Sequence, residues 1–131
     1  MSTVGPIAAV NRTRRVLLAQ NVRIANTHWT RLRGLMGTTQ SAFDTGQALW
    51  IVPCHGVHTI AMRFPLDLLY LDHYSTVIHL EEDIKPWRFA AVKPSAASVL
   101  ELPAGTIRSS GTNVGDKIEI ATANQPEELA A

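Results

Sequence analysis

The chain has 131 residues, with 12 Lys or Arg, 11 Asp or Glu, a formal net charge of +1 at pH 7 and a hydrophobic fraction of 46%. This composition is typical of a globular protein, and a net charge near zero gives no general attraction to nucleic acid or to a membrane surface. The single cysteine excludes an intramolecular disulfide, so the fold needs no oxidising compartment. No apolar run approaches the roughly 18 residues of a membrane span.

The two ends of the chain differ in character from its middle. Residues 1–11 and 122–131 are small or polar, contain proline and show no periodicity, so we expect frayed ends around one domain with an ordered core of about residues 15–121. The N-terminal charges follow a short apolar stretch, whereas a secretory signal has the reverse order. We therefore expect a cytoplasmic protein.

Arginines are concentrated in the first third of the chain. Residues 1–43 contain six arginines and no acidic residue. A clustered positive charge of this kind can bind an acidic partner. The candidates for such a contact are Arg12, Arg14, Arg15, Arg31 and Arg33.

The first half of the chain contains three short apolar runs that predict strands. Residues 16–19 and 22–24 flank a Gln20-Asn21 turn, and residues 48–52 form a third run that Pro53 ends. Between them, Asn26 or Thr27 can cap a short helix through its side-chain oxygen. The predicted helix has an apolar stripe at positions i, i+3 and i+7, and Gly37 would end it. The stripe comprises Trp29, Leu32 and Met36.

The second half of the chain contains four further predicted strands. Residues 66–71 (LDLLYL) are apolar on both faces, which indicates a central strand covered on both sides. The other three are residues 76–80, 99–102 and 118–120. The sequence therefore predicts a mainly β (α+β) domain of about six or seven short strands with one or two short helices. We expect a strongly bent sheet or a small open barrel.

The segment PCHGVHTIAMRFPLD, residues 53–67, holds the only cysteine and two of the five histidines. In an extended strand Cys54 and His58 would lie roughly 13 Å apart, too far for a nucleophile–base hydrogen bond. A hydrolase using Cys54 or His58 would need a bend at Gly56. Cys54, His55 and His58 are possible zinc ligands, but a closed site needs four, so we predict neither metal nor cofactor.

Four polar side chains at the end of this segment form the candidate site. They are His58, Thr59, Arg63 and Asp67. Asp67 shares a strand face with buried leucines and therefore needs a donor, which Arg63 can supply as an ion pair. Two interpretations remain open: the groups satisfy one another structurally, or they bind a small polar ligand or a peptide. Glu101 faces away from Leu100 and Leu102, so it is either exposed or paired with an arginine of the first helix.

Three stretches together resemble one known family. They are RLRGLMG (31–37), VHTIAMRFPLDLLYLD (57–72) and VLELPAGTIRSSGTNVGDKIEI (99–120). The chain resembles, over about residues 15–120, the domain-of-unknown-function 192 family of small bacterial and archaeal proteins. The resemblance implies a compact β-rich domain and supplies no reaction, so catalytic residues stay unassigned. From the residues we predict non-covalent binding at 58–67, with a hydrolase or an arginine-based interaction module as alternatives.

Overall fold

The computed structural model describes residues 5–122 and is built mainly from β-strands. Its strands are β1 (Ile7–Asn11), β2 (Val16–Ala19), β3 (Asn21–Ala25), β4 (Gln47–Ile51), β5 (Leu66–Leu71), β6 (Val77–Ile84), β7 (Ser98–Pro103) and β8 (Ile118–Thr122). Two short helices, α1 (His28–Arg33) and α2 (Thr106–Ser110), and a 3-10 turn, η1 (Gln40–Ala42), complete the described elements. The predicted fold class is confirmed, with eight strands where six or seven were expected.

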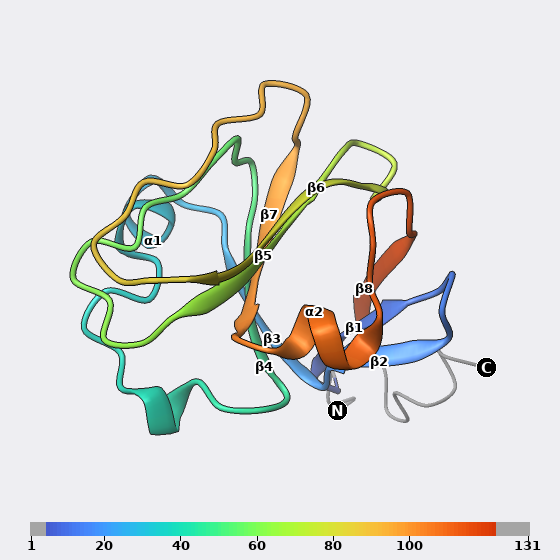
Figure 1. The fold of residues 1–131 in the computed structure, drawn as a ribbon, viewed down its shortest axis with the longest axis horizontal. Coiled ribbons are helices and arrows are strands. Elements are labelled where there is room, and N and C mark those ends of the chain that lie inside the picture. The colour runs from blue at the N-terminus through green and yellow to red at the C-terminus, as the bar shows by residue number, and fades with distance from the viewer. Residues whose placement is uncertain (1–4, 123–131) are drawn as a thin grey trace, which may run out of the picture.

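The strands form two open sheets rather than a closed barrel within the described residues (Figure 1). The smaller sheet has the order β2-β1-β8, and the larger has the order β3-β4-β7-β5-β6. Strand β3 pairs with β4 in parallel, and the other pairs are antiparallel. Strand β7 therefore lies at the centre of the larger sheet, between β4 and β5.

The larger sheet is covered on both faces. Because side chains alternate along a strand, Leu100 and Leu102 of β7 join a core cluster that includes Ile107 of α2 and Ile118 of β8. Val99, on the opposite face, belongs to a second cluster. That cluster also contains residues of the loops between the strands, such as Leu35, Met62 and Ala90. All six residues of β5 are buried, which confirms the predicted doubly covered central strand.

Residues 7–11 were expected to be frayed, and this expectation is wrong. They form β1, which pairs with β2 on one side and with β8 on the other. Ala8, Ala9 and Val10 are completely buried. Because positions on both faces of this strand are buried, its sequence shows no alternation of apolar and polar residues. Residues 1–4 and 123–131 lie outside the described part of the chain, and Thr122 ends β8.

Helix α1 begins where the sequence predicts but ends earlier. The Thr27 hydroxyl accepts a hydrogen bond from the Thr30 backbone N–H and caps the helix, which ends at Gly34 rather than Gly37. The predicted apolar stripe is not buried: Trp29 and Leu32 are 68% and 62% exposed. Neither described helix is long and apolar enough to cross a membrane.

Candidate functional site

A pocket of about 550 Å³ opens between α1 and residues 53–58. Strands β4 and β7 contribute Ile51 and Glu101 to its lining, and the turn after α1 contributes Leu35 and Met36. The apolar lining also includes Leu32, Val57, Met62 and Val92, and the polar lining includes Arg31, Arg33 and three histidines. The pocket therefore combines an apolar wall with a few polar side chains, as small-molecule sites do.

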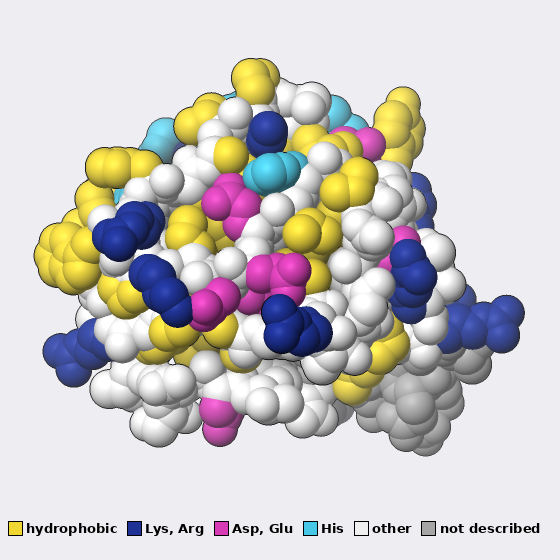
Figure 2. Space-filling view, in the orientation of Figure 1, with side chains coloured by type: hydrophobic (Ala, Val, Ile, Leu, Met, Phe, Trp, Pro, Cys, Tyr) yellow, Lys and Arg dark blue, Asp and Glu magenta, His cyan; other side chains and the backbone are white. Residues whose placement is uncertain are grey.

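One wall of the pocket is an irregular two-stranded arrangement. Residues 54–59 run beside residues 88–97 and are joined to them by four backbone hydrogen bonds of 2.8–3.0 Å. Gly56 is needed at the closest approach, because a Cβ there would lie 2.8 Å from the Ala91 carbonyl oxygen. Hydrophobic and basic side chains gather at the left of the molecule in Figure 2, over the segment between β6 and β7. The exposed Trp87, Phe89 and Val92 belong to this segment.

Glu101 is the unusual residue of the pocket. It is 3% exposed and its neighbours on the adjacent strands are Leu49 and Leu68. Its Oε1 is buried without a hydrogen-bond partner among the described residues. Burial raises the pKa of the Glu101 carboxyl to about 8, so at pH 7 the group is mainly neutral. Neither sequence-based expectation holds, because Glu101 is neither exposed nor paired with an arginine.

Arg31 presents a fixed positive charge to the same pocket. Its guanidinium donates to the Pro53 carbonyl at 3.1 Å, the His28 Nδ1 at 3.2 Å and the Thr27 carbonyl at 3.4 Å. No carboxylate in the described part of the chain lies within 4.0 Å of it. The side chain is therefore held in place by neutral acceptors, and its charge has no counter-ion.

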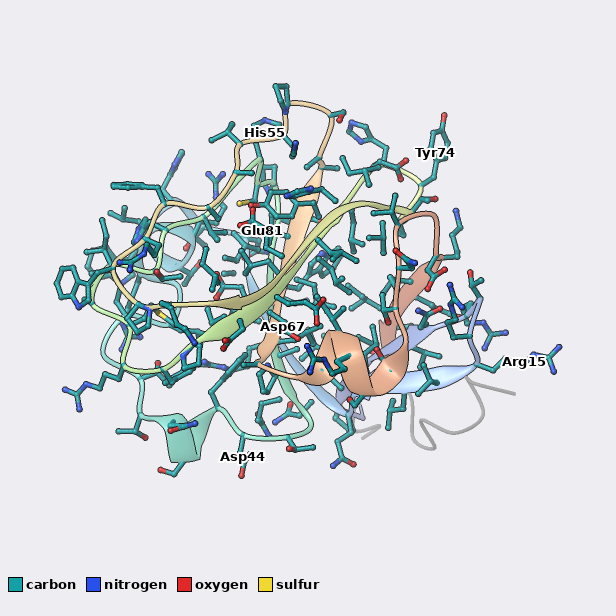
Figure 3. The ribbon with its side chains drawn as sticks, in the orientation of Figure 1. Arg15, Asp44, His55, Asp67, Tyr74 and Glu81 are labelled. Carbon is teal, nitrogen blue, oxygen red and sulfur yellow. The ribbon has the colours of Figure 1, made fainter. Side chains whose placement is uncertain are left out.

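The histidines of the pocket have defined hydrogen-bonding states. His28 Nδ1 accepts from Arg31, which can only donate, and His58 Nδ1 accepts from the Ile60 backbone N–H at 3.3 Å. Both rings therefore carry their proton on Nε2. His55 differs, because its Nδ1 donates to the Ala96 carbonyl oxygen at 2.7 Å. His55 lies near the start of β7, far from Asp67 (Figure 3).

Cys54 lies in the pocket wall as a thiol. Its Sγ donates to the Gly56 carbonyl oxygen at 3.0 Å rather than to a histidine. Burial raises the pKa of the Cys54 thiol, which leaves little of the nucleophilic thiolate at neutral pH. Within residues 5–122, no group of three or more His, Cys, Asp or Glu side chains could hold a metal ion.

The four residues proposed from the sequence do not form one site. His58 lines the pocket. Thr59 is completely buried, and its hydroxyl donates to the Lys85 carbonyl at 2.6 Å and accepts from the Arg88 backbone N–H at 2.8 Å. Thr59 thus fixes the neighbouring segment and does not face the pocket.

The predicted Arg63–Asp67 ion pair is wrong. Arg63 is exposed, whereas Asp67 is completely buried on the α2 side of the sheet (Figure 3). Asp67 accepts from the backbone N–H groups of Asp83 at 2.9 Å, Gly105 at 3.1 Å and Ile107 at 2.9 Å. Three backbone donors therefore replace the expected guanidinium, and they come from segments that are distant in the sequence.

The arginine-rich third does not form one basic face. Arg12, Arg14 and Arg15 lie at the turn between β1 and β2, where Arg12 pairs with Glu119 and Arg14 with Asp116. Arg31 and Arg33 belong to α1 and line the pocket. Figure 1 shows the β1–β2 turn and α1 at opposite sides of the molecule.

The family is established by sequence comparison. The chain belongs to the DUF192 family, described as "Uncharacterized ACR, COG1430", whose model matches residues 9–120. An archaeal UPF0127 protein of Thermococcus sibiricus is 30% identical over 115 residues, which cover 84% of this chain and 72% of that protein. A UPF0127 protein of Pyrococcus abyssi is 29% identical over 119 residues, which cover 86% of this chain and 97% of that protein.

Two solved structures share the fold. A protein of unknown function from Novosphingobium aromaticivorans has a TM-score of 0.72 and 18% identity, with 88% of this chain and 84% of that chain covered. A putative transcription regulator from Sinorhizobium meliloti 1021 has a TM-score of 0.69 and 22% identity, with 91% of this chain and 98% of that chain covered. At these identities the similarity concerns the fold alone.

Proposed function

We propose that the protein binds a small molecule non-covalently in the pocket between α1 and residues 53–58. The observation that carries this proposal is the buried Glu101 carboxyl, which has no hydrogen-bond partner and lines the pocket. Burying a polar group without a partner costs about 1–3 kcal/mol. A ligand that hydrogen-bonds to Glu101 would offset this cost in the bound state.

The shape and composition of the pocket support the same function. Its volume of about 550 Å³ is within the range of pockets that enclose small molecules. Arg31 and the four backbone hydrogen bonds of the 54–59 wall hold its sides in place without a ligand. A preformed site loses little conformational entropy when it binds.

The two alternatives receive less support. A hydrolase would need Cys54 or His58 as an activated group, but Cys54 donates to a backbone carbonyl and its pKa is raised by burial. An interaction module based on the arginines would need them on one surface, yet they lie at two separate places and two of them are paired with acids. Neither alternative accounts for the buried Glu101 oxygen that has no hydrogen-bond partner.

The proposal is tested by titrating isotope-labelled protein with a set of small carboxylates, amines, amides and alcohols, followed by two-dimensional NMR. We expect chemical-shift changes that map to residues 28–36 and 53–58 and to Glu101. Met36→Trp, which enlarges a side chain of the pocket lining, should abolish them. Leu17→Trp, on strand β2 beside a different pocket, is the matched control and should leave the chemical-shift changes intact. Shift changes that are absent, or that survive Met36→Trp, would refute the proposal.

A further inference from the structure

We infer that the ligand of this pocket is a small organic carboxylate with an apolar body, whose anionic group is bound by Arg31 and by the Glu101 carboxyl. This inference rests on the proposed function of the pocket and adds the chemical class of its ligand. It is carried by three separate features of the lining: its charge, its hydrogen-bond donors and its apolar surface.

The charge of the lining favours an anion. Arg31 and Arg33 line the pocket, and neither has a carboxylate within 4.0 Å among the described residues. Glu101 is the one acidic residue of the lining, and with a pKa of about 8 it is mainly neutral at pH 7. Two cationic side chains therefore face the pocket with no negative charge to balance them, and a carboxylate would supply it.

The polar atoms of the lining are mostly donors. The Nδ1 atoms of His28 and His58 are occupied as acceptors, which leaves an Nε2–H group on each ring. Arg31 has two N–H groups beyond the three that bond to the protein. A neutral Glu101 adds an O–H donor. A carboxylate only accepts, so it matches this set, whereas an ammonium group only donates.

Arg31, Cys54 and Glu101 line the same pocket. Burial is the main cause of the raised pKa of the Cys54 thiol, and of the two proposed anchors Glu101 adds to this shift while Arg31 opposes it. The apolar side chains around them, such as Leu35, Met36 and Val57, would contact the rest of the ligand. An inorganic anion would leave this apolar surface unused.

Three probes with one apolar body and different heads test the inference: phenylbutyrate, phenylbutylamine and phenylbutyramide. We expect phenylbutyrate to bind in the pocket with millimolar affinity by NMR titration at pH 7. The amine and the amide should bind at least about tenfold more weakly, a difference of one decade in Kd. An amine or amide that binds as tightly as phenylbutyrate would overturn the carboxylate inference and leave the binding function of the pocket intact.

Two variants locate the anionic group. Arg31→Gln should weaken phenylbutyrate binding about tenfold or more, and Arg23→Gln, which changes an exposed arginine outside the pocket, should have no effect. Because Arg31 also joins α1 to Pro53, the ranking of the three probes on the unaltered protein provides a test that needs no variant. If none of the probes shifts the pocket resonances, the carboxylate inference is wrong, and the wider ligand set described above decides separately whether the pocket binds ligands.

Discussion

Asp67 and Glu101 lie on neighbouring strands of one sheet but in opposite chemical surroundings. Both are buried, with 0% and 3% of their surfaces exposed. Asp67 faces α2 and accepts three backbone hydrogen bonds. Glu101 faces the pocket on the other side of the sheet and has a buried oxygen with no partner. The Asp67 carboxylate is therefore hydrogen-bonded within the fold, whereas the Glu101 carboxyl has an oxygen that no described residue bonds.

Asp116 extends this contrast between the two sides of the molecule. Burial disfavours its ionisation, but hydrogen bonds from Arg14, Asn11 and the Asn113 backbone outweigh burial and lower the pKa of its carboxyl. These three bonds are each 2.9 Å long. Asp67 and Asp116, the buried acids around α2 and β8, therefore each accept three hydrogen bonds from the protein. The comparison teaches that burial alone does not distinguish the two kinds of acid, and that the missing hydrogen-bond partner is what sets Glu101 apart.

The largest expected effect is that of removing Asp67. Asp67→Ala would leave three backbone N–H groups without their acceptor, and each such loss costs about 1–3 kcal/mol. We expect the free energy of unfolding to fall by about 3 kcal/mol or more, measured by urea denaturation.

Asp44→Ala is the matched control for this change. Asp44 is exposed and projects away from the body of the protein (Figure 3), so its removal should change stability by less than about 0.5 kcal/mol. Similar effects for the two variants would mean that the three backbone bonds to Asp67 contribute little, and the contrast with Glu101 would fail.

Replacing Glu101 should raise the free energy of unfolding rather than lower it. Glu101→Met keeps a side chain of similar size and removes the unpartnered polar group, so we expect the variant without ligand to be more stable by about 1–3 kcal/mol near pH 7. Urea denaturation measures the difference, and phenylbutyrate binding should weaken in the same variant. A strongly destabilised Glu101→Met protein would show that the carboxyl has a structural role, like Asp67.

The pH dependence sharpens this prediction. The Glu101 pKa is about 8 in the folded protein and about 4.3 in an unfolded chain, so between these values the folded state holds the additional proton. The associated stability is complete below the unfolded pKa and is lost as the pH rises through about 8. Over this range the folding equilibrium constant should fall up to about tenfold per pH unit. Glu101→Met should lack this pH-dependent loss of stability. The difference in the free energy of unfolding between Glu101→Met and the unaltered protein should therefore grow from pH 6 to pH 8 and then level off.

Much of the fold could be predicted because its strongest signals are local. The LDLLYL run is apolar on both faces, and it forms the doubly covered strand β5. Thr27 caps α1 through a hydroxyl–backbone bond that depends on adjacent residues only. Strand β1 was missed because its small buried residues owe their place to pairing with β8, more than 100 residues away in sequence.

The site was harder to predict because it depends on contacts between distant segments. His58 was identified, but the donors to Asp67 come from residues 83, 105 and 107, which the sequence does not connect to it. Glu101 was missed because a charged residue between two leucines usually marks a solvent-facing position. One signal was available: the runs that form β4 and β5, its neighbours, are apolar on both faces, which indicates that the sheet is covered on the Glu101 face too.

Cys54 provides the smallest expected effect and a direct test of the hydrolase alternative. Its thiol donates to the Gly56 carbonyl oxygen. Burial, with a smaller contribution from the nearby Glu101, raises the pKa of the thiol, while the Gly56 backbone and Arg31 only partly oppose this shift. Cys54→Ala should therefore bind phenylbutyrate as the unaltered protein does and lose no more than about 1 kcal/mol of stability.

Iodoacetamide should react slowly with Cys54 at pH 7 and faster with rising pH, because the thiolate is the reacting form. In Glu101→Met, where the neighbouring carboxylate is absent, the reaction above pH 8 should be faster than in the unaltered protein. Rapid labelling at pH 7 would instead indicate an activated thiolate, and the site would then have to be considered catalytic rather than a binding pocket.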